Sequence, residues 1–366
     1  MSQDAPPYDA PPCDAPPYDA LLLLSFGGPE GPDDVLPFLR NVTRDRDVPD
    51  ERLAVVAQQY ELFGGRSPIN AQCRDLLAAL RTELADHNVT LPLYWGNRNW
   101  DPFLADTVAT MAGDGVTNAL VFATSAFGSY SGCRQYQQDL AGAADTVGPI
   151  APRLSKLRLF YNHPGFIEAM ADRLQHSLAG PPPASRISLA QGPTRIVFSA
   201  HSIPQTMADG CQYRDQLHEA ARLVLAAAGV EPHYDLVFQS RSGPPSMPWL
   251  EPDVNAQLRG LAADGVSRVV LVPIGFISDH MEVLFDLDTQ ARATAEELGL
   301  ELIRVPTVGT HPRFVTMIRQ LIEERLVGAD RLSLGSDGPW PDQCPVGHCP
   351  PPSRPAGPGR RDHADG

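Results

Sequence analysis

ALLLLSFGG (residues 20–28) and RIVFSAHSIP (residues 195–204) are the two stretches that decide the fold of this chain. Each begins with a run of mainly apolar and small residues and then changes abruptly to glycine or polar residues. Strands of a parallel sheet read in this way, because helices cover both faces of the sheet. The two stretches therefore predict two buried parallel strands, one in each half of the chain.

Further runs of the same kind flank these two strands. Apolar runs occupy residues 91–95, 119–123, 157–161, 235–239, 268–274 and 302–305, and helical patterns occupy 71–86, 103–112, 166–178, 214–228 and 282–298. Strands that alternate with helices indicate an α/β fold, and four strands followed by four more indicate two doubly wound halves. An eight-stranded barrel is the rival arrangement. The proline- and glycine-rich break at residues 145–165 favours the two halves.

The composition of the two ends differs from that of the body. Residues 1–19 repeat the unit Asp-Ala-Pro-Pro and predict a disordered, extended tail, and residues 333–366 form a Pro/Gly-rich tail with a pair of cysteines. We therefore expect four segments: the tail 1–19, an N-terminal domain over 20–160, a C-terminal domain over 161–332, and the tail 333–366.

Charge and hydropathy exclude several classes of protein. The 366 residues carry a formal net charge of −15, which is unfavourable for a general nucleic-acid binder. The longest early apolar run, residues 21–24, is far too short to span a membrane, and the acidic N-terminus lacks the basic start of a signal peptide. We therefore expect a cytoplasmic protein without a transmembrane segment, in which six cysteines serve as core thiols or metal ligands rather than as a disulfide framework.

Side chains that follow the strands are the candidates for chemistry, because ligands of open α/β sheets bind beyond the carboxyl ends of the strands. His201 follows one such strand, and an imidazole there can accept protons or bind a divalent metal; hydrogen bonding to a neighbouring loop is the structural alternative. Glu282 and Asp286 are four residues apart and share a helix face, as a proton or cation path requires. A helix-capping box from Asp279 to Glu282 is the simpler interpretation of that motif. Ser67 is similarly predicted to cap the helix that Pro68 begins.

Six ordered stretches of the sequence resemble the ferrochelatase family. They are LLLLSFGGPE (21–30), YWGNRNW (94–100), SAHSIP (199–204), FQSRSGP (238–244), WLEP (249–252) and PIGFISDHMEVLFDLD (273–288). The resemblance implies the chelatase fold, two similar Rossmann-like halves, each with a four-stranded parallel sheet, and a porphyrin in the cleft between them. The cysteines of the C-terminal tail are typical of actinobacterial members. In those the resemblance implies a lyase that inserts Fe²⁺ into coproporphyrin III to form coproheme in haem biosynthesis, with protoporphyrin IX as the alternative substrate.

The resemblance also implies roles for residues on the two sides of the cleft. His201 and Glu282 are the expected Fe²⁺ ligands, or alternatively the proton acceptor and its partner. Asp286 matches the next acid of a relay, which Gln290 interrupts where some members have glutamate.

Three other positions match residues that contact the porphyrin. Ser67 and Tyr136 correspond to contacts with its propionate and ring. Phe26 stands where some members have a tyrosine that binds the product iron, and phenylalanine has no atom with which to do so.

The cysteines match part of a [2Fe–2S] site. Cys133 corresponds to an internal ligand, and Cys344 and Cys349 correspond to two of the three ligands in the tail. The fourth ligand is left open between Cys211, His348 and a chain without the cluster.

The implied partners are coproporphyrin III and Fe²⁺, with a transient handover of the product to the next enzyme of the haem pathway. A non-catalytic porphyrin carrier and a zinc hydrolase that uses His201, His280 and Glu282 are the competing hypotheses. A carrier has no need of a histidine opposed by a glutamate.

Overall fold

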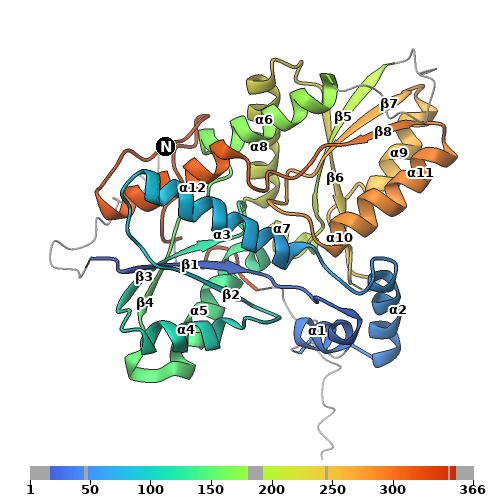
Figure 1. Cartoon of the computed structure of the whole chain (residues 1–366). Helices are drawn as coiled ribbons and strands as arrows, with labels where there is room; N and C mark the ends of the chain where they lie inside the picture. Colours follow the sequence, from blue (N-terminus) through green and yellow to red (C-terminus); the bar gives the residue numbers. More distant parts are fainter. Residues whose placement is uncertain (1–16, 45–47, 180–192, 244–245, 345–346, 352–366) are drawn as a thin grey trace, which may run out of the picture.

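The computed structural model of the protein describes residues 17–44, 48–179, 193–243, 246–344 and 347–351 (Figure 1). Two four-stranded sheets, parallel throughout, form its framework, with strand orders β2-β1-β3-β4 and β6-β5-β7-β8. The strands are β1 (Ala20–Ser25), β2 (Leu93–Asn97), β3 (Asn118–Ala123), β4 (Arg153–Lys156), β5 (Thr194–His201), β6 (Tyr234–Gln239), β7 (Arg268–Val272) and β8 (Glu301–Arg304). The predicted fold class, two similar doubly wound halves, is confirmed.

The longer helices cover both sheets (Figure 1). The contacts run from α3 to α12, from α12 to α6 and from α6 to α8, so these four helices form a connected layer. The α-helices are α1 (Val35–Val42), α2 (Asp50–Glu61), α3 (Ile69–Asp86), α4 (Leu104–Gly113), α5 (Gln135–Val147), α6 (Pro164–Ala179), α7 (Gln205–Ala208), α8 (Tyr213–Ala228), α9 (Val254–Ala263), α10 (Met281–Val283), α11 (Arg292–Glu297) and α12 (Pro312–Leu326). Short 3₁₀ turns occupy Pro32–Asp34 and Gly148–Ile150, and π-helical turns occupy Tyr130–Arg134 (η2) and Leu284–Ala291 (η4).

The two halves share one hydrophobic core. Leu21 and Leu23 of β1 belong to the same buried cluster as Phe198 and Ala200 of β5. The opposite face of β1, with Leu22 and Leu24, packs separately against α4 and α5. Side chains alternate between the faces of a strand, so the unbroken leucine run serves both cores at once.

One predicted strand is wrong in position. The strand expected at 157–161 lies instead at β4, directly before it, and only the Leu157 N–H continues the ladder, to the Val121 carbonyl at 2.9 Å. The apolar side chains of 157–161 are buried by helices: Phe160 packs against Phe166 of α6 and Phe314 of α12. The run was therefore apolar because of helix packing and not because of strand pairing.

Both predicted caps are also wrong. Ser67 does not cap α3: the N-cap is Pro68 and no side-chain hydrogen bond caps the helix, while the Ser67 N–H donates to the Pro29 carbonyl at 2.9 Å. His280, and not Asp279, caps α10. The Asp279 carboxylate forms an ion pair with Arg304 of β8 instead.

The C-terminal segment after α12 is held against the stretch of chain between β4 and α6. The carbonyls of Leu334 and Gly338 accept hydrogen bonds from the Asn162 amide, and Asp337 accepts one from the Tyr161 hydroxyl. Residues 1–16 of the predicted N-terminal tail lie outside the described residues, as do 352–366 of the C-terminal one. The exact bounds of the four predicted segments stay a prediction.

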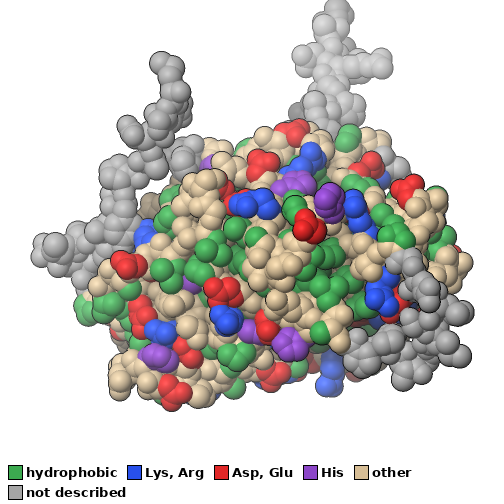
Figure 2. Space-filling view, turned by 90° about the horizontal axis from the view of Figure 1, so that it is seen from above, with side chains coloured by type: hydrophobic (Ala, Val, Ile, Leu, Met, Phe, Trp, Pro, Cys, Tyr) green, Lys and Arg blue, Asp and Glu red, His purple; other side chains and the backbone are tan. Residues whose placement is uncertain are grey.

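Two features concern the outer surface. On the face that Figure 2 shows, basic, acidic and histidine side chains are mixed with hydrophobic ones rather than gathered by sign. None of the helices in the described ranges combines the length and the apolar character that a membrane span needs.

Candidate active site

His201 is the last residue of β5, at the carboxyl end of the second sheet. Its Nδ1 contacts the Ser202 carbonyl oxygen, which cannot donate, so Nδ1 carries the proton. In the neutral ring, Nε2 is therefore the atom with the free electron pair. The hydroxyl of Tyr213 donates to the His201 carbonyl at 3.1 Å and supports the strand end from behind.

Glu282 lies opposite this nitrogen. Its Oε2 is 3.5 Å from His201 Nε2 and 3.9 Å from His280 Nδ1, and its side chain is half exposed. The sequence places Glu282 in the first turn of α10, where the His280 ring accepts the Glu282 N–H at 3.3 Å and orients the turn. The pair that the motifs predicted is thus brought together, on a side that solvent reaches.

His201 and Glu282 each stabilise the charged form of the other. Burial opposes a charge on His201, but the Glu282 carboxylate outweighs it and raises the pKa of the imidazole. Burial likewise works against the Glu282 anion, but His201 and then His280 lower its pKa to about 2. Glu282 is therefore ionised at neutral pH, and His201 holds its proton more firmly than a free histidine does.

Asp286 lies one turn further along, in the π-helical turn η4. The Ser240 hydroxyl, at the end of β6, donates to its carboxylate at 2.5 Å. Burial and the nearby Glu282 raise the pKa of Asp286 to about 6, although the bond from Ser240 opposes the rise. Gln290, the position at which the predicted relay of acids is interrupted, is exposed. A carboxyl with a pKa close to the working pH can take up and release a proton.

Arg304 of β8 fixes the segment that carries these acids. Its guanidinium bonds Asp279, before α10, at 3.0 Å and Asp288, within η4, at 2.8 Å. Both ends of the segment that bears Glu282 and Asp286 are therefore tied to the sheet.

The first half contributes a group of aromatic rings around Arg98, the residue after β2, in which Tyr136 and the Arg98 side chain are buried. The Arg98 guanidinium lies 5.8 Å from the Phe26 ring centre and 4.6 Å from that of Tyr136, and it pairs with Asp139. Phe26 is half-buried and packs edge-on against Phe38 of α1, 6.2 Å between ring centres. Two of the three predicted porphyrin contacts thus share one basic neighbour.

Ser67, the third predicted contact, is buried. A side chain at Gly28 would meet the Ser67 Cβ at 2.7 Å, so the glycine after β1 lets the two loops approach. The sequence motifs indicated neither Arg98 nor Arg304 as a site residue. The position of Arg98 directly after β2 was a signal that could have indicated it. Arg304 had no such signal, because its partners are distant in the sequence.

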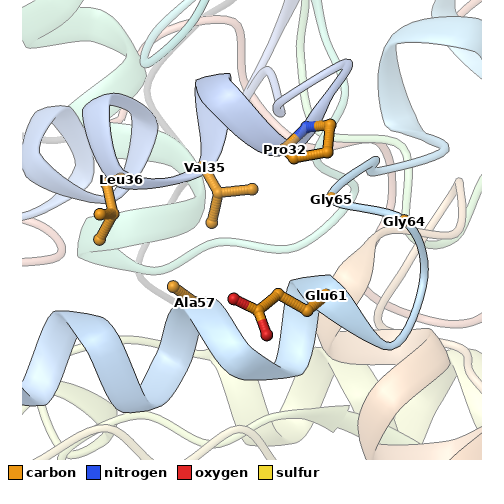
Figure 3. Close-up of a pocket in the computed structure, with 7 residues that line it drawn as sticks. All are labelled: Pro32, Val35, Leu36, Ala57, Glu61, Gly64 and Gly65. Carbon is orange, nitrogen blue, oxygen red and sulfur yellow. The ribbon is translucent and has the colours of Figure 1, made fainter.

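Helices α1 and α2 of the first half reach the second half near Glu282. Tyr60 of α2 packs in one apolar cluster with Met281, and burial, with a smaller contribution from the charge of Glu282, raises the pKa of Tyr60. A pocket of about 430 Å³ opens between α1, α2 and Gly64–Gly65, with the Glu61 carboxylate among its lining residues (Figure 3). It contains neither His201 nor Glu282, so it is separate from the site described above.

Four cysteines meet on another side of the molecule, in two pairs. The thiols of Cys133 and Cys344 are hydrogen-bonded to each other, as are those of Cys211 and Cys349. These bonds lower the pKa of Cys133 to about 6 and that of Cys211 to about 7. No three His, Cys, Asp or Glu side chains within the described ranges are arranged to hold a single metal ion.

A comparison with solved structures places the fold. SirB from Bacillus subtilis with Fe³⁺ superposes with a TM-score of 0.53, covering 85% of this chain and 96% of that chain at 11% sequence identity. At that identity the likeness concerns the fold alone. The architecture is the chelatase fold. The match of the sequence to a ferrochelatase family model adds the class of protein, a metal-chelating lyase.

The family follows from sequence comparisons. A family model described as ferrochelatase matches residues 18–326. A ferrochelatase of Rhodopirellula baltica is 50% identical, covering 90% of this chain and 93% of its own. A coproporphyrin III ferrochelatase of Streptomyces griseus is 51% identical with the same coverage, and one of Frankia alni is 52% identical over 91% of this chain and 87% of its own. The chain belongs to the ferrochelatase family.

Proposed function

We propose that this enzyme inserts Fe²⁺ into coproporphyrin III to form coproheme, a step of haem biosynthesis. The observation that carries the proposal is the opposition of His201 Nε2 and Glu282 Oε2 at 3.5 Å on the open side of the second sheet. Relatives that cover nine-tenths of this chain at about half identity are named for coproporphyrin III. A carrier would not need this pair, and a zinc hydrolase is not in keeping with the family.

His201 is proposed to accept the pyrrole protons that iron displaces. Its Nδ1 proton is committed to the Ser202 carbonyl, so Nε2 is the basic atom and faces the reaction side. Glu282 raises the basicity of the ring and offers negative charge to an incoming dication. The alternative proposal is that the same two side chains bind Fe²⁺ as it enters, since the single electron pair of Nε2 cannot hold a proton and an iron ion at once.

Asp286 is proposed to pass protons or cations onward from Glu282. Its pKa of about 6 suits a group that changes charge near neutral pH. The exposed Gln290 cannot be ionised, so the proposed path ends at Asp286 and opens to water there.

The macrocycle is proposed to lie against Phe26 and Tyr136, with Ser67 near a propionate. Arg98 orders this region rather than a carboxylate of the substrate, because its guanidinium lies beside both rings and is already paired with Asp139. Phe26 offers no ligand to the product iron from that side.

The choice of coproporphyrin III over protoporphyrin IX rests on relatives and is tested directly. Fe²⁺ and either porphyrin are mixed with the enzyme without oxygen, and metalloporphyrin formation is followed by absorbance. We expect a higher kcat/KM for coproporphyrin III. Preference for protoporphyrin IX would contradict the substrate, and no product above the uncatalysed rate would contradict the activity.

We further propose that Cys133, Cys344, Cys349 and a fourth ligand hold a [2Fe–2S] cluster. The residues fit such a group, because each iron of the cluster takes two protein ligands and the thiols here stand in pairs. When bound, the cluster supplies a cross-link between the C-terminal segment and the body. No step of iron insertion is assigned to it.

Two further expectations stay predictions. Handover of coproheme to the next enzyme of the pathway is one expectation. A cytoplasmic location is the other expectation.

A further inference from the structure

We infer that Cys211 is the fourth ligand of the proposed cluster, so that the cluster joins both halves of the enzyme to its C-terminal segment. The inference rests on the cluster proposal and deepens it. Cys133 belongs to η2 of the first half and Cys211 follows α7 of the second, whereas Cys344 and Cys349 come from the segment after α12.

The contacts between the thiols support four sulfur ligands. Cys211 is hydrogen-bonded to Cys349, as Cys133 is to Cys344. Besides the hydrogen bond with Cys211 and burial, the charges of all three other cysteines raise the pKa of Cys349, so the two pairs are neighbours. Two adjacent pairs of thiolates are what the two irons of an all-cysteine cluster require.

Each sulfur of the quartet also has its own nitrogen donor. Lys156 donates to Cys133, and the backbone N–H of Tyr213 donates to Cys211. The Trp340 Nε1 donates to Cys344 at 3.4 Å, and the His348 Nδ1 is 3.0 Å from the Cys349 sulfur. Donors around the sulfurs stabilise thiolates and are the usual outer shell of an iron–sulfur site.

His348 is the rival fourth ligand, and its orientation argues against it. Its Nδ1 is directed at the Cys349 sulfur, which turns Nε2, on the far side of the ring, away from that sulfur. The ring packs against Trp340, 5.6 Å between centres, and the His348 carbonyl accepts from Arg134 at 2.9 Å. His348 therefore serves as a hydrogen-bond donor to a ligand.

Cys211 also links the quartet to the active site. Its neighbour Tyr213 donates its backbone N–H to the Cys211 sulfur and its hydroxyl to the His201 carbonyl at 3.1 Å. Gly210 lies so close to Pro350 that an added Cβ would be 2.9 Å from the proline ring. The C-terminal segment thus packs against the loop between α7 and α8, which carries Cys211.

The test measures the cluster itself. The full chain is purified without oxygen, and its iron, acid-labile sulfide and visible absorption are compared with those of C211S, H348A and C73S. Cys73 is buried in α3, away from the quartet, and is the matched control. We expect the wild type, H348A and C73S to hold iron and sulfide in the [2Fe–2S] ratio, and C211S to lose both.

The outcomes separate the two proposals. A wild type without sulfide contradicts the cluster, while iron insertion is judged separately by turnover. A C211S variant that keeps the cluster overturns the role of Cys211 alone, and loss of the cluster in H348A together with its retention in C211S would assign the fourth ligand to His348.

A second measurement covers the case in which C211S does not fold. The reduced wild-type cluster, made with ¹⁵N-histidine, is examined by electron–nuclear double resonance. Absence of a directly coordinated histidine nitrogen supports four thiolates, and a strongly coupled one overturns the inference.

Discussion

At the scale of single residues, the reaction depends on which nitrogen of His201 is free. The Ser202 carbonyl holds the proton on Nδ1, so the acceptor is Nε2, and Glu282 sits 3.5 Å from it. Neither contact can be seen in the sequence, although His201 and Glu282 were both predicted as site residues. Their roles remain proposals that substitution tests.

The first prediction concerns His201→Ala. Removal of a general base costs about 10²–10⁴-fold in rate, so we expect kcat for iron insertion to fall by that factor while porphyrin still binds. Stopped-flow absorbance measures the first and fluorescence quenching the second. His233→Ala, at an exposed histidine, is the control. Turnover close to that of the wild type would contradict the role of His201.

The second prediction concerns the pH dependence of Glu282→Gln. The wild-type carboxylate raises the pKa of His201 above its ordinary value, and without it burial lowers that pKa. Because neutral His201 is the acceptor, activity rises as pH climbs through this pKa. The rising limb of kcat against pH should therefore move to lower pH in the variant, and the KM for Fe²⁺ should increase. An unmoved limb would show that Glu282 does not set the basicity of His201.

At the scale of elements, the segment from Asp279 to Asp288 is the most unusual part of the site. It begins with one turn of α10 and continues as the π-helical turn η4, although the sequence predicted one regular helix over 282–298. Arg304 ties both of its ends to β8. We regard Arg304 as a positioning residue for Glu282 and Asp286.

The third prediction concerns Arg304→Gln. Loss of an outer-shell partner typically costs about 10- to 100-fold in activity or metal affinity, so we expect kcat/KM for Fe²⁺ to fall by that factor with porphyrin affinity unchanged. The matched control is Arg268→Gln, which breaks a pair with Glu301 (2.8 Å) at the amino end of the same two strands. Equal activity losses in both variants would indicate a merely structural role.

At the scale of the whole molecule, the two halves are joined by one core and by a buried ion pair. The side chains of Arg158 and Glu324 are 1% and 2% exposed, 2.7 Å apart, and Arg158 also bonds the Leu332 carbonyl. The pair thus connects the chain after β4, helix α12 and the start of the C-terminal segment.

The fourth prediction concerns Glu324→Gln. Removing one partner of a buried pair leaves a charge without compensation and costs about 3–5 kcal/mol. We expect the free energy of unfolding in urea to fall by that amount. Glu168→Gln, in the exposed pair with Arg313, is the control and should cost about 0–1 kcal/mol. A loss in E324Q no larger than in E168Q would mean that the pair does not anchor the C-terminal segment.

Sequence patterns predicted the fold better than its boundaries. The leucine run of β1 and the stretch ending at His201 were recognised because burial on both faces leaves a direct record in composition. The run 157–161 was misread because helix packing leaves the same record as strand pairing. Ser67 was wrongly predicted as the N-cap of α3 because serine is a common capping residue. In the structure its N–H donates to the Pro29 carbonyl, and Pro68 is the N-cap.

By itself, the sequence determined the fold class, the family and the pair His201 and Glu282, since periodicity and short motifs are local properties of the chain. Only the tertiary structure decided that Cys211 meets Cys349, that Arg98 stands between Phe26 and Tyr136, and that Arg304 holds Asp279 and Asp288. These contacts join residues far apart along the chain, or on different elements, and their geometry is set by how two sheets and their helices pack.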